Sequence, residues 1–219
     1  MPGHSSSTCD PMAKSGDTMK VEFHFDFGSP NAYLSHVVIP QIEQRTGVTF
    51  EYVPILLGGI FKLTNNQSPV MAYANIRNKM DYERREMSRF IQRHGISRFR
   101  FNPHFPVNTL LLMRGAVAAK RAGILPTYTD AMFPAMWEDG KKMDDPEVVR
   151  ATLQQAGLDP ALLDQAQDQA VKDELARNTE RSVERGSFGA PTFFIDDEMY
   201  FGKNTLREVE DEIRRRKGR

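Results

Sequence analysis

The sequence predicts an α/β fold in which a long helical segment interrupts a small mixed sheet. Three observations support this prediction. A strand pattern, a helix pattern and a second strand pattern follow one another over residues 20–55. Two strand patterns and a helix pattern follow residue 190, near the C-terminus. Between these units, residues 70–185 show helical patterns and no convincing strand.

The first strand is predicted over residues 20–27, KVEFHFDF. Apolar and polar side chains alternate strictly along this stretch, and three of the apolar ones are phenylalanine. Alternation with a period of two, rich in aromatic residues, is typical of a β-strand. Gly28 ends the pattern.

A helix is predicted to start directly after this strand. Ser29 has the form of an N-cap, followed by proline at the first helical position. The helix is expected to run to about Thr46, with a kink at Pro40 and an end at Gly47. Residues 48–55, VTFEYVPI, form the second predicted strand. A β-α-β unit of this kind places its two strands parallel, with a right-handed crossover.

The central part of the chain is predicted to be helical. Residues 56–69, LLGGIFKLTNNQSP, are expected to form a loop because of their paired glycines and polar end. A long charged helix is expected over residues 71–95. Further helix patterns are found at about residues 109–122, 126–138, 145–156, 159–167 and 167–185.

The last part of the chain contains a predicted hairpin, PTFFIDD followed by EMYFGK, and a closing helix with Asn204 as its candidate N-cap. Without the central helices the order is β-α-β-α-β-β-α, the topology of thioredoxin. We therefore expect a thioredoxin-like domain formed by residues 20–69 and 186–219. Residues 70–185 are expected to form a helical insertion domain, and residues 1–19 a flexible leader.

Composition excludes several classes of protein. The chain has 219 residues, of which 29 are Lys or Arg and 29 are Asp or Glu. A net charge of zero argues against a general nucleic-acid binder, because phosphate binding needs a positive excess. The single cysteine, Cys9, excludes an internal disulfide, a Cys-based zinc cluster and C-x-x-C redox chemistry.

No targeting or membrane signal is visible. No apolar run approaches the roughly 20 residues of a membrane span. The leader MPGHSSSTCDPMAKSGDTM lacks the apolar core of a secretory signal. A cytoplasmic enzyme is therefore the expected class.

Ser29 occupies the place where chemistry is expected in such a fold. Ligands bind beyond the carboxyl ends of parallel strands, and a helix N-terminus stabilises an anion there. The serine supplies no thiolate, but its hydroxyl can donate a hydrogen bond to a thiolate carried by a ligand, which lowers the pKa of that thiol. A plain helix cap is the simpler interpretation. A serine nucleophile is disfavoured, because no G-x-S-x-G elbow surrounds Ser29 and neither His24 nor His36 has an evident role as its base.

A second informative stretch is GSFGAPTFF, residues 186–194. Proline directly before a strand, after a small residue, suits a cis-proline that turns the N–H and C=O of Ala190 outward to pair with an extended peptide. The simpler interpretation is a proline that starts an edge strand. Together with Ser29, the Ala190–Pro191 pair predicts a site for a thiol-bearing peptide, and glutathione is the abundant cytosolic one.

The chain resembles the 2-hydroxychromene-2-carboxylate isomerase family, relatives of kappa-class glutathione transferases and of bacterial disulfide oxidoreductases. The resemblance runs from about Lys20 to Arg215. It is carried by six ordered stretches: FHFDFGSPNAYL, LLGGIFKLTNN, NKMDYERREM, FNPHFPVNT, AMWEDGKKMDDPEVV and GSFGAPTFFIDDEMYFG.

The resemblance implies roles for particular residues. Ser29 resembles the residue that hydrogen-bonds the glutathione sulfur, and Ala190 with Pro191 resembles the backbone clamp on its cysteinyl part. Lys62, together with either Asn65 or Asn66, resembles residues that help hold the glycyl end or the acidic substrate. Unaided by the resemblance, Lys62 is more simply a solvated surface lysine. Trp137, the sole tryptophan, is expected either to wall a substrate pocket or to pack in the core.

One stretch departs from the family pattern. The family usually shows Gly-x-Asp-Arg-Leu after the last strand, where the aspartate engages the γ-glutamyl ammonium. This chain reads GKNTL, with Lys203 and Asn204 at the corresponding positions. Asn204 still accepts a hydrogen bond but lacks the charge, and Lys203 adds a cation that would repel an ammonium.

The resemblance implies a glutathione-dependent isomerase that acts on a small aromatic carboxylate by reversible thiolate addition. It also implies a homodimer, although the sequence shows no unambiguous interface signal. The alternatives are a kappa-class-like glutathione transferase and a non-catalytic thiol- or peptide-binding module. A disulfide oxidoreductase is the weakest alternative, because the C-x-x-C position reads SPNA. No metal, nucleic-acid or membrane partner is expected.

Overall fold

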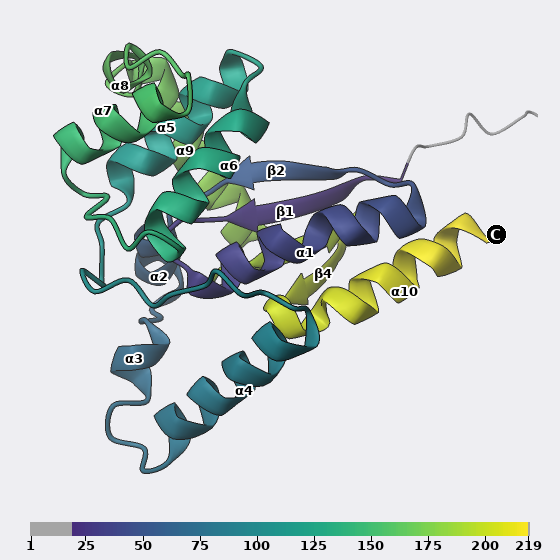
Figure 1. Ribbon diagram of the computed structural model, residues 1–219. Helices are drawn as coiled ribbons and strands as arrows, with labels where there is room; N and C mark the ends of the chain where they lie inside the picture. The colour runs from purple at the N-terminus through teal and green to yellow at the C-terminus, as the bar shows by residue number, and fades with distance from the viewer. Residues whose placement is uncertain (1–18, 219) are drawn as a thin grey trace, which may run out of the picture.

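A computed structural model describes residues 19–218 of the protein. A four-stranded mixed sheet with strand order β2-β1-β3-β4 lies at its centre (Figure 1). Strand β1 (Val21–Phe25) pairs in parallel with β2 (Phe50–Pro54) and antiparallel with β3 (Thr192–Ile195). Strand β3 pairs antiparallel with β4 (Glu198–Phe201). The N-terminal β-α-β unit and the C-terminal hairpin therefore form one sheet, which confirms the predicted α/β fold.

An aromatic core fills one face of the sheet. Phe23 of β1 stacks on Phe193 of β3, with ring centroids 5.3 Å apart, and meets Tyr52 edge-on at 4.9 Å. Aromatic pairs in such offset or edge-on geometry stabilise a core beyond the area they bury. Helices α1 (Pro30–Thr46) and α10 (Leu206–Lys217) pack against each other over the sheet (Figure 1).

The opposite face of β1 is polar in sequence yet buried in the structure. Glu22 and His24 are 5% and 2% exposed, beneath α9 (Gln169–Glu184). The ring nitrogen Nδ1 of His24 lies 2.9 Å from the hydroxyl oxygen of Ser182 on α9, and Glu22 is paired with Arg185. Both faces of the sheet are thus covered. Glu22 is paired and His24 is bound through Nδ1, whereas Nε2 of His24 has no hydrogen-bond partner among the described residues.

Helix α1 forms as predicted from its local signals. Ser29 is the N-cap and accepts a hydrogen bond from the backbone N–H of Ala32 at 3.2 Å. Gly47 ends the helix with φ 66°, a left-handed conformation that glycine adopts without steric cost. Pro40 lies inside the helix.

Residues 56–69 do not form the expected loop, because α2 (Leu57–Thr64) occupies most of this stretch. Ile60 is fully buried and packs with Val53 and Ile55. Gly59 faces α9 so closely that a Cβ there would lie 3.0 Å from a methyl group of Thr179. The paired glycines, interpreted as a loop signal, permit close helix packing, and burial overrides their weak helix propensity.

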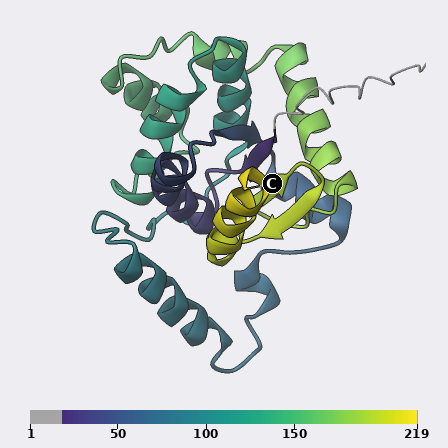
Figure 2. The same cartoon turned by 90° about the vertical axis from the view of Figure 1, so that its right-hand side faces the viewer.

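The single long helix expected over residues 71–95 is instead two helices. α3 (Pro69–Ala72) begins at the N-cap Ser68, and α4 (Lys79–Arg93) follows after a connection. Asn78 interrupts helical geometry with φ 68°. Helix α4 extends away from the rest of the protein in both views (Figures 1 and 2), and Phe90 is its buried residue.

The remaining helices of the central segment follow the predicted pattern within a few residues, except that α8 is much shorter than expected. Helices α5 to α8 lie together on the side toward which β1 and β2 point (Figure 1), whereas α9 covers the sheet face of Glu22 and His24 as described. Their bounds are α5 (Leu110–Arg121), α6 (Leu125–Trp137), α7 (Pro146–Gln155), α8 (Leu162–Gln165) and α9 as given above. Within the described residues, no helix combines the length and apolar character needed to cross a bilayer.

The turn before the last helix differs from the prediction. A short 3-10 helix, η1 (Lys203–Thr205), precedes α10, and Thr205 rather than Asn204 stands at the N-cap position. Asn204 therefore does not cap α10, and its side chain remains available for other contacts. Whether residues 70–185 behave as a separate domain stays a prediction, and the leader, including Cys9, lies almost entirely outside the described residues.

Candidate functional site

Ser29 connects two parts of the chain that are 161 residues apart. It lies at the carboxyl end of β1, is 4% exposed, and caps α1 as described. Its hydroxyl also donates a hydrogen bond to the backbone carbonyl of Ala190 at 3.0 Å. The simple cap interpretation of Ser29 is therefore correct but incomplete, because the same hydroxyl reaches the second predicted stretch.

The loop around Ala190 is held by its own hydroxyl groups. Ser187 and Thr192 each donate to the carbonyl of Gly189, at 3.1 and 2.9 Å, and the peptide bond between Ala190 and Pro191 is cis. The carbonyl of Ala190 is bound by Ser29 and is not free, contrary to expectation. The N–H of Ala190 has no hydrogen-bond partner among residues 19–218. Ala190 thus offers one free backbone donor beside Ser29.

The end of α2 approaches this loop. The side-chain amide of Asn66 donates to the carbonyl of Phe188 at 2.8 Å. Asn65 ends α2 with φ 52°, and Lys62 lies on the last turn of that helix rather than in a loop. Both of these side chains are exposed. The structure therefore brings Asn66 into contact with the clamp loop and places Lys62 and Asn65 on the adjoining helix end.

The turn before α10 borders the other side of the loop. The N–H of Gly202 donates to the carbonyl of Pro191 at 2.9 Å. Asn204 is exposed, and its side-chain oxygen lies 3.4 Å from the ammonium of Lys203. The Lys203 side chain is only 4% exposed and is ion-paired with Glu86 of α4. We expected Lys203 to present a cation to the ligand, but its charge is compensated by Glu86.

Trp137 does not line a pocket. Its side chain is 0% exposed, and its indole N–H donates to the carbonyl of Phe27 at 2.7 Å. Rings of Phe99 and Phe105 pack around it, with centroids about 6 Å away. A side chain without accessible surface does not touch a substrate, so core packing is the correct alternative. Its contact with Phe27 supports the backbone two residues before Ser29.

Asp26, for which the sequence predicted no role, holds together the backbone segments that carry the site. Its carboxylate accepts hydrogen bonds from the backbone N–H groups of Gly28 and Leu57, at 2.8 and 2.7 Å. Leu57 is the first residue of α2, so Asp26 joins the start of α2 to the turn that precedes α1. Complete burial raises the pKa of the Asp26 carboxyl. The sequence signal that could have identified Asp26 is a charged residue at the end of a strand that is covered on both faces.

Asn31, in the first turn of α1, is a second residue that sequence reasoning missed. Its side-chain oxygen Oδ1 is buried and has no hydrogen-bond partner among the described residues. The unpartnered acceptor of Asn31 and the unpartnered donor of Ala190 both belong to segments that meet at Ser29. The N–H of Ala190 can donate to a carbonyl of a ligand, whereas the Asn31 oxygen has no accessible surface. The residues present therefore fit a small peptide-like molecule.

The two histidines considered as bases have other partners. His24 contacts Ser182 as described, and Nδ1 of His36 lies 2.9 Å from the hydroxyl of Tyr52. Among residues 19–218, no group of three His, Cys, Asp or Glu side chains is placed to hold a metal ion. The chemistry available at Ser29 is hydrogen bonding and anion stabilisation at a helix N-terminus.

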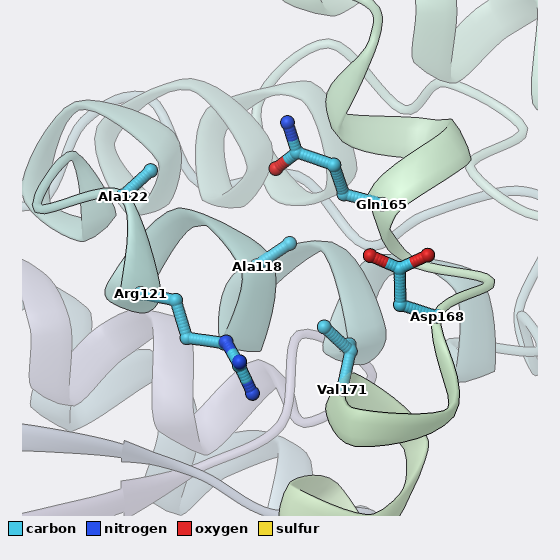
Figure 3. Close-up of a pocket in the computed structure, with 6 residues that line it drawn as sticks. All are labelled: Ala118, Arg121, Ala122, Gln165, Asp168 and Val171. Atoms are coloured by element: carbon cyan, nitrogen blue, oxygen red, sulfur yellow. The ribbon is translucent and has the colours of Figure 1, made fainter.

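Two cavities are found in the helical segment, away from Ser29. Figure 3 shows one of about 220 Å³, where Arg121 of α5 and Asp168 before α9 lie on opposite walls. The larger, of about 580 Å³, lies between α5, α7 and α8 and includes Arg114 and Arg150. None of the residues predicted for the site lines either cavity.

Comparison with known proteins identifies the family of the chain. The family model of DsbA-like thioredoxin domains matches residues 20–214. A 2-hydroxychromene-2-carboxylate isomerase of Pseudomonas putida is 26% identical over 200 residues, which cover 90% of this chain and 95% of that protein. Glutathione S-transferase kappa 1 of Rattus norvegicus is 24% identical over 85% of this chain and 87% of its own length.

Solved structures show the same likeness. A structure of 2-hydroxychromene-2-carboxylate isomerase superposes with a TM-score of 0.77 at 27% identity, covering 90% of this chain and 95% of that one. A probable DsbA oxidoreductase of Streptomyces coelicolor, at 18% identity and a TM-score of 0.67 over 89% of each chain, shares the fold. The chain therefore belongs to the family of DsbA-like thioredoxin domains, and its sequence resembles the members named 2-hydroxychromene-2-carboxylate isomerase.

Proposed function

We propose that this protein is a glutathione-dependent isomerase that acts on a small aromatic carboxylate of the 2-hydroxychromene-2-carboxylate type. The observation that carries the proposal is the position of the Ser29 hydroxyl, which caps α1 and reaches the carbonyl of Ala190 at 3.0 Å. Relatives named as isomerases and as kappa-class glutathione transferases support the same conclusion. The proposal includes a cytoplasmic location, where glutathione is abundant, and a homodimer.

In this proposal Ser29 is the catalytic residue. Its hydroxyl turns from the carbonyl of Ala190 to donate a hydrogen bond to the ligand sulfur. The N-terminus of α1 adds the positive end of its dipole, and both contributions favour the charged form of a thiol and lower its pKa. When bound, glutathione supplies a thiolate that adds reversibly to a conjugated double bond, which permits rotation before elimination restores the double bond.

The neighbouring residues orient the ligand in this proposal. The free N–H of Ala190 donates to a carbonyl of the cysteinyl part. Lys62 and Asn65, exposed at the end of α2, bind the glycyl carboxylate or the carboxylate of the substrate. Asn66 holds the loop itself through the carbonyl of Phe188.

The variant Ser29→Ala tests the catalytic role. We expect the pKa of bound glutathione to rise by about one unit or more, because a hydrogen bond to a charged group contributes about 1.5–3 kcal/mol and one pKa unit equals about 1.4 kcal/mol. Turnover should fall by about tenfold or more at neutral pH. Thiolate absorbance in the ultraviolet measures the first effect and steady-state isomerisation the second.

Ser35→Ala is the matched control. Ser35 is buried on the same helix, and its hydroxyl donates to the carbonyl of Asn31 at 2.9 Å. This variant loses a comparable hydroxyl group without removing the N-cap of α1, so the thiol pKa should stay within a few tenths of the wild-type value. Unchanged turnover and thiol pKa in Ser29→Ala would contradict the assigned role.

A glutathione transferase of kappa type is the second candidate, favoured by the kappa-class relatives. It would release a stable conjugate instead of regenerating the thiol. Incubation of the protein with glutathione and either chlorodinitrobenzene or a chromene carboxylate separates the two. Consumption of glutathione indicates a transferase, whereas isomerisation at constant glutathione concentration indicates an isomerase.

A further inference from the structure

The segments that carry the site contain no acidic side chain. They are residues 28–35, 57–67, 186–192 and 202–206. Two lysines, Lys62 and Lys203, lie within them. Three acidic groups contact these segments from elsewhere, and each already has a partner. Glu138 accepts a hydrogen bond from the hydroxyl of Tyr33 at 2.9 Å and is ion-paired with Arg98. Asp26 accepts backbone N–H groups beneath the site, and Glu86 of α4 is paired with Lys203. The surface around Ser29 therefore suits anionic groups and offers an ammonium no carboxylate partner within these segments.

The turn before α10 is the clearest example of a segment without a carboxylate for an ammonium. It is fixed beside the clamp by the hydrogen bond from Gly202 to the carbonyl of Pro191. The exposed side chain of Asn204 has its oxygen 3.4 Å from the ammonium of Lys203, which also lies 5.2 Å from the ring centroid of Phe90. The neutral amide of Asn204 can accept a hydrogen bond from an ammonium but supplies no opposite charge, and hydrogen bonds to charged acceptors are roughly twice as strong. An amine of the ligand therefore gains little binding free energy from this turn.

The opposite side of the clamp suits a carboxylate. Lys62 is exposed, and no acidic side chain of residues 19–218 lies within ion-pair distance of it. Asn66 connects this helix end to the loop at Phe188. The end of α2 contacts the loop at Phe188 and the turn before α10 contacts it at Pro191, so a peptide that pairs with the N–H of Ala190 binds between these two segments.

We propose that the site recognises its thiol ligand as an anion, through a carboxylate and the sulfur, and does not require a free amino group. The ligand class is therefore that of small acidic thiols, including those whose amine is acylated. This inference rests on the thiol-dependent function proposed above and specifies which thiols it accepts.

Calorimetric titration of the full chain with three probes tests the inference. The probes are glutathione, its N-acetyl derivative and its glycyl ethyl ester. We expect the N-acetyl derivative to bind within about twofold of glutathione, because the ammonium has no carboxylate partner. The ester should bind about threefold more weakly, as expected for loss of one exposed ion pair with Lys62.

Asn204→Asp provides the reciprocal test. Asn204 is exposed, so this substitution leaves the core intact, and the new carboxylate should make the protein prefer the free amine about fivefold over the N-acetyl derivative. The control Gln154→Glu makes the same change from amide to carboxylate at an exposed position of α7. It should leave the ratio of the two affinities unchanged.

The outcomes separate the inference from the proposed function. A wild-type preference of about fivefold or more for the free amine would overturn the inference and leave the thiol-dependent function intact. The inference would also be overturned if Asn204→Asp and Gln154→Glu changed the ratio of the two affinities equally. If none of the three probes binds the wild-type protein, the proposed function fails and the inference fails with it.

Discussion

Replacement of Trp137 by phenylalanine tests how the site is supported from the core. The indole is fully buried, and its N–H donates to the carbonyl of Phe27 at 2.7 Å. Phenylalanine removes this donor and leaves the carbonyl without its partner. It also removes ring atoms that pack against Phe99 and Phe105.

The expected loss of stability follows from these two contributions. A buried carbonyl left without a hydrogen bond costs about 1–3 kcal/mol. The missing ring atoms correspond to roughly two methylene groups, or about 1–2 kcal/mol of lost burial and packing. We therefore expect Trp137→Phe to lower the free energy of unfolding by about 3 kcal/mol, a large share of the ~5–15 kcal/mol typical of a domain.

Urea unfolding followed by far-ultraviolet circular dichroism measures this loss without relying on tryptophan fluorescence. Because Trp137 is the sole tryptophan, emission from the wild-type protein should be blue-shifted, as for a buried indole. Tyr128→Phe is the matched control. It removes a buried hydroxyl that donates to the carbonyl of Leu112 at 3.0 Å with almost no change of volume. Its cost should be about 1 kcal/mol.

The effect of Trp137→Phe on kcat/KM distinguishes a residue that packs in the core from one that lines a substrate pocket. With no accessible surface, Trp137 contributes no direct substrate contact. We expect kcat/KM of Trp137→Phe to stay within about threefold of the wild-type value under conditions where the variant is folded, a difference of less than about 1 kcal/mol. A loss of stability below about 1 kcal/mol together with a tenfold fall in kcat/KM would refute this reasoning.

Two further substitutions probe the buried framework. Burial raises the pKa of Asp26, so its protonated form adds stability that is fully present below the unfolded pKa and is lost as pH rises through the folded pKa. The cost of Asp26→Asn in urea unfolding should therefore shrink with rising pH, and a cost that stays constant would contradict the shift. Gly115→Ala should cost about 1–3 kcal/mol, because its Cβ would lie 2.2 Å from the Tyr128 hydroxyl oxygen. Thermal unfolding measures this loss of stability. Gly115→Ala should cost less in a Tyr128→Phe background, which lacks the clashing hydroxyl, and an equal cost there would contradict the reasoning.

Local signals in the sequence were sufficient for the elements of the sheet and for α1. Alternation of apolar and polar residues is a property of a strand alone, and the cap at Ser29 and the glycine at position 47 act on their own helix. Ser29 and the Ala190–Pro191 pair were predicted to belong to one site, and the Ser29 hydroxyl donates to the carbonyl of Ala190 in the structure. That carbonyl was expected to be free, and the ligand roles of these residues stay predictions.

Other features depend on contacts that no local pattern contains. Helix α2 was mistaken for a loop because its stability comes from Ile60 packed beneath α9 and from the carboxylate of Asp26, which is distant in sequence. The two-helix form of residues 69–93 depends on the left-handed Asn78. In both places tertiary burial or backbone geometry outweighs helix propensity, which differs by less than about 1 kcal/mol per residue for most residue types.

The sequence by itself determined the four strands, helix α1 with its cap at Ser29, the closing helix and the absence of a C-x-x-C thiol pair. Only the tertiary structure decided which side chains near the site are buried and which charges are compensated by an ion pair. Trp137 is buried because the rings of the connector at residues 99–105 pack around it and the carbonyl of Phe27 accepts its N–H. Lys203 is neutralised because α4 brings Glu86 to it across 117 positions of sequence. Burial and ion pairing depend on distances in space, and residue type and spacing do not specify these distances.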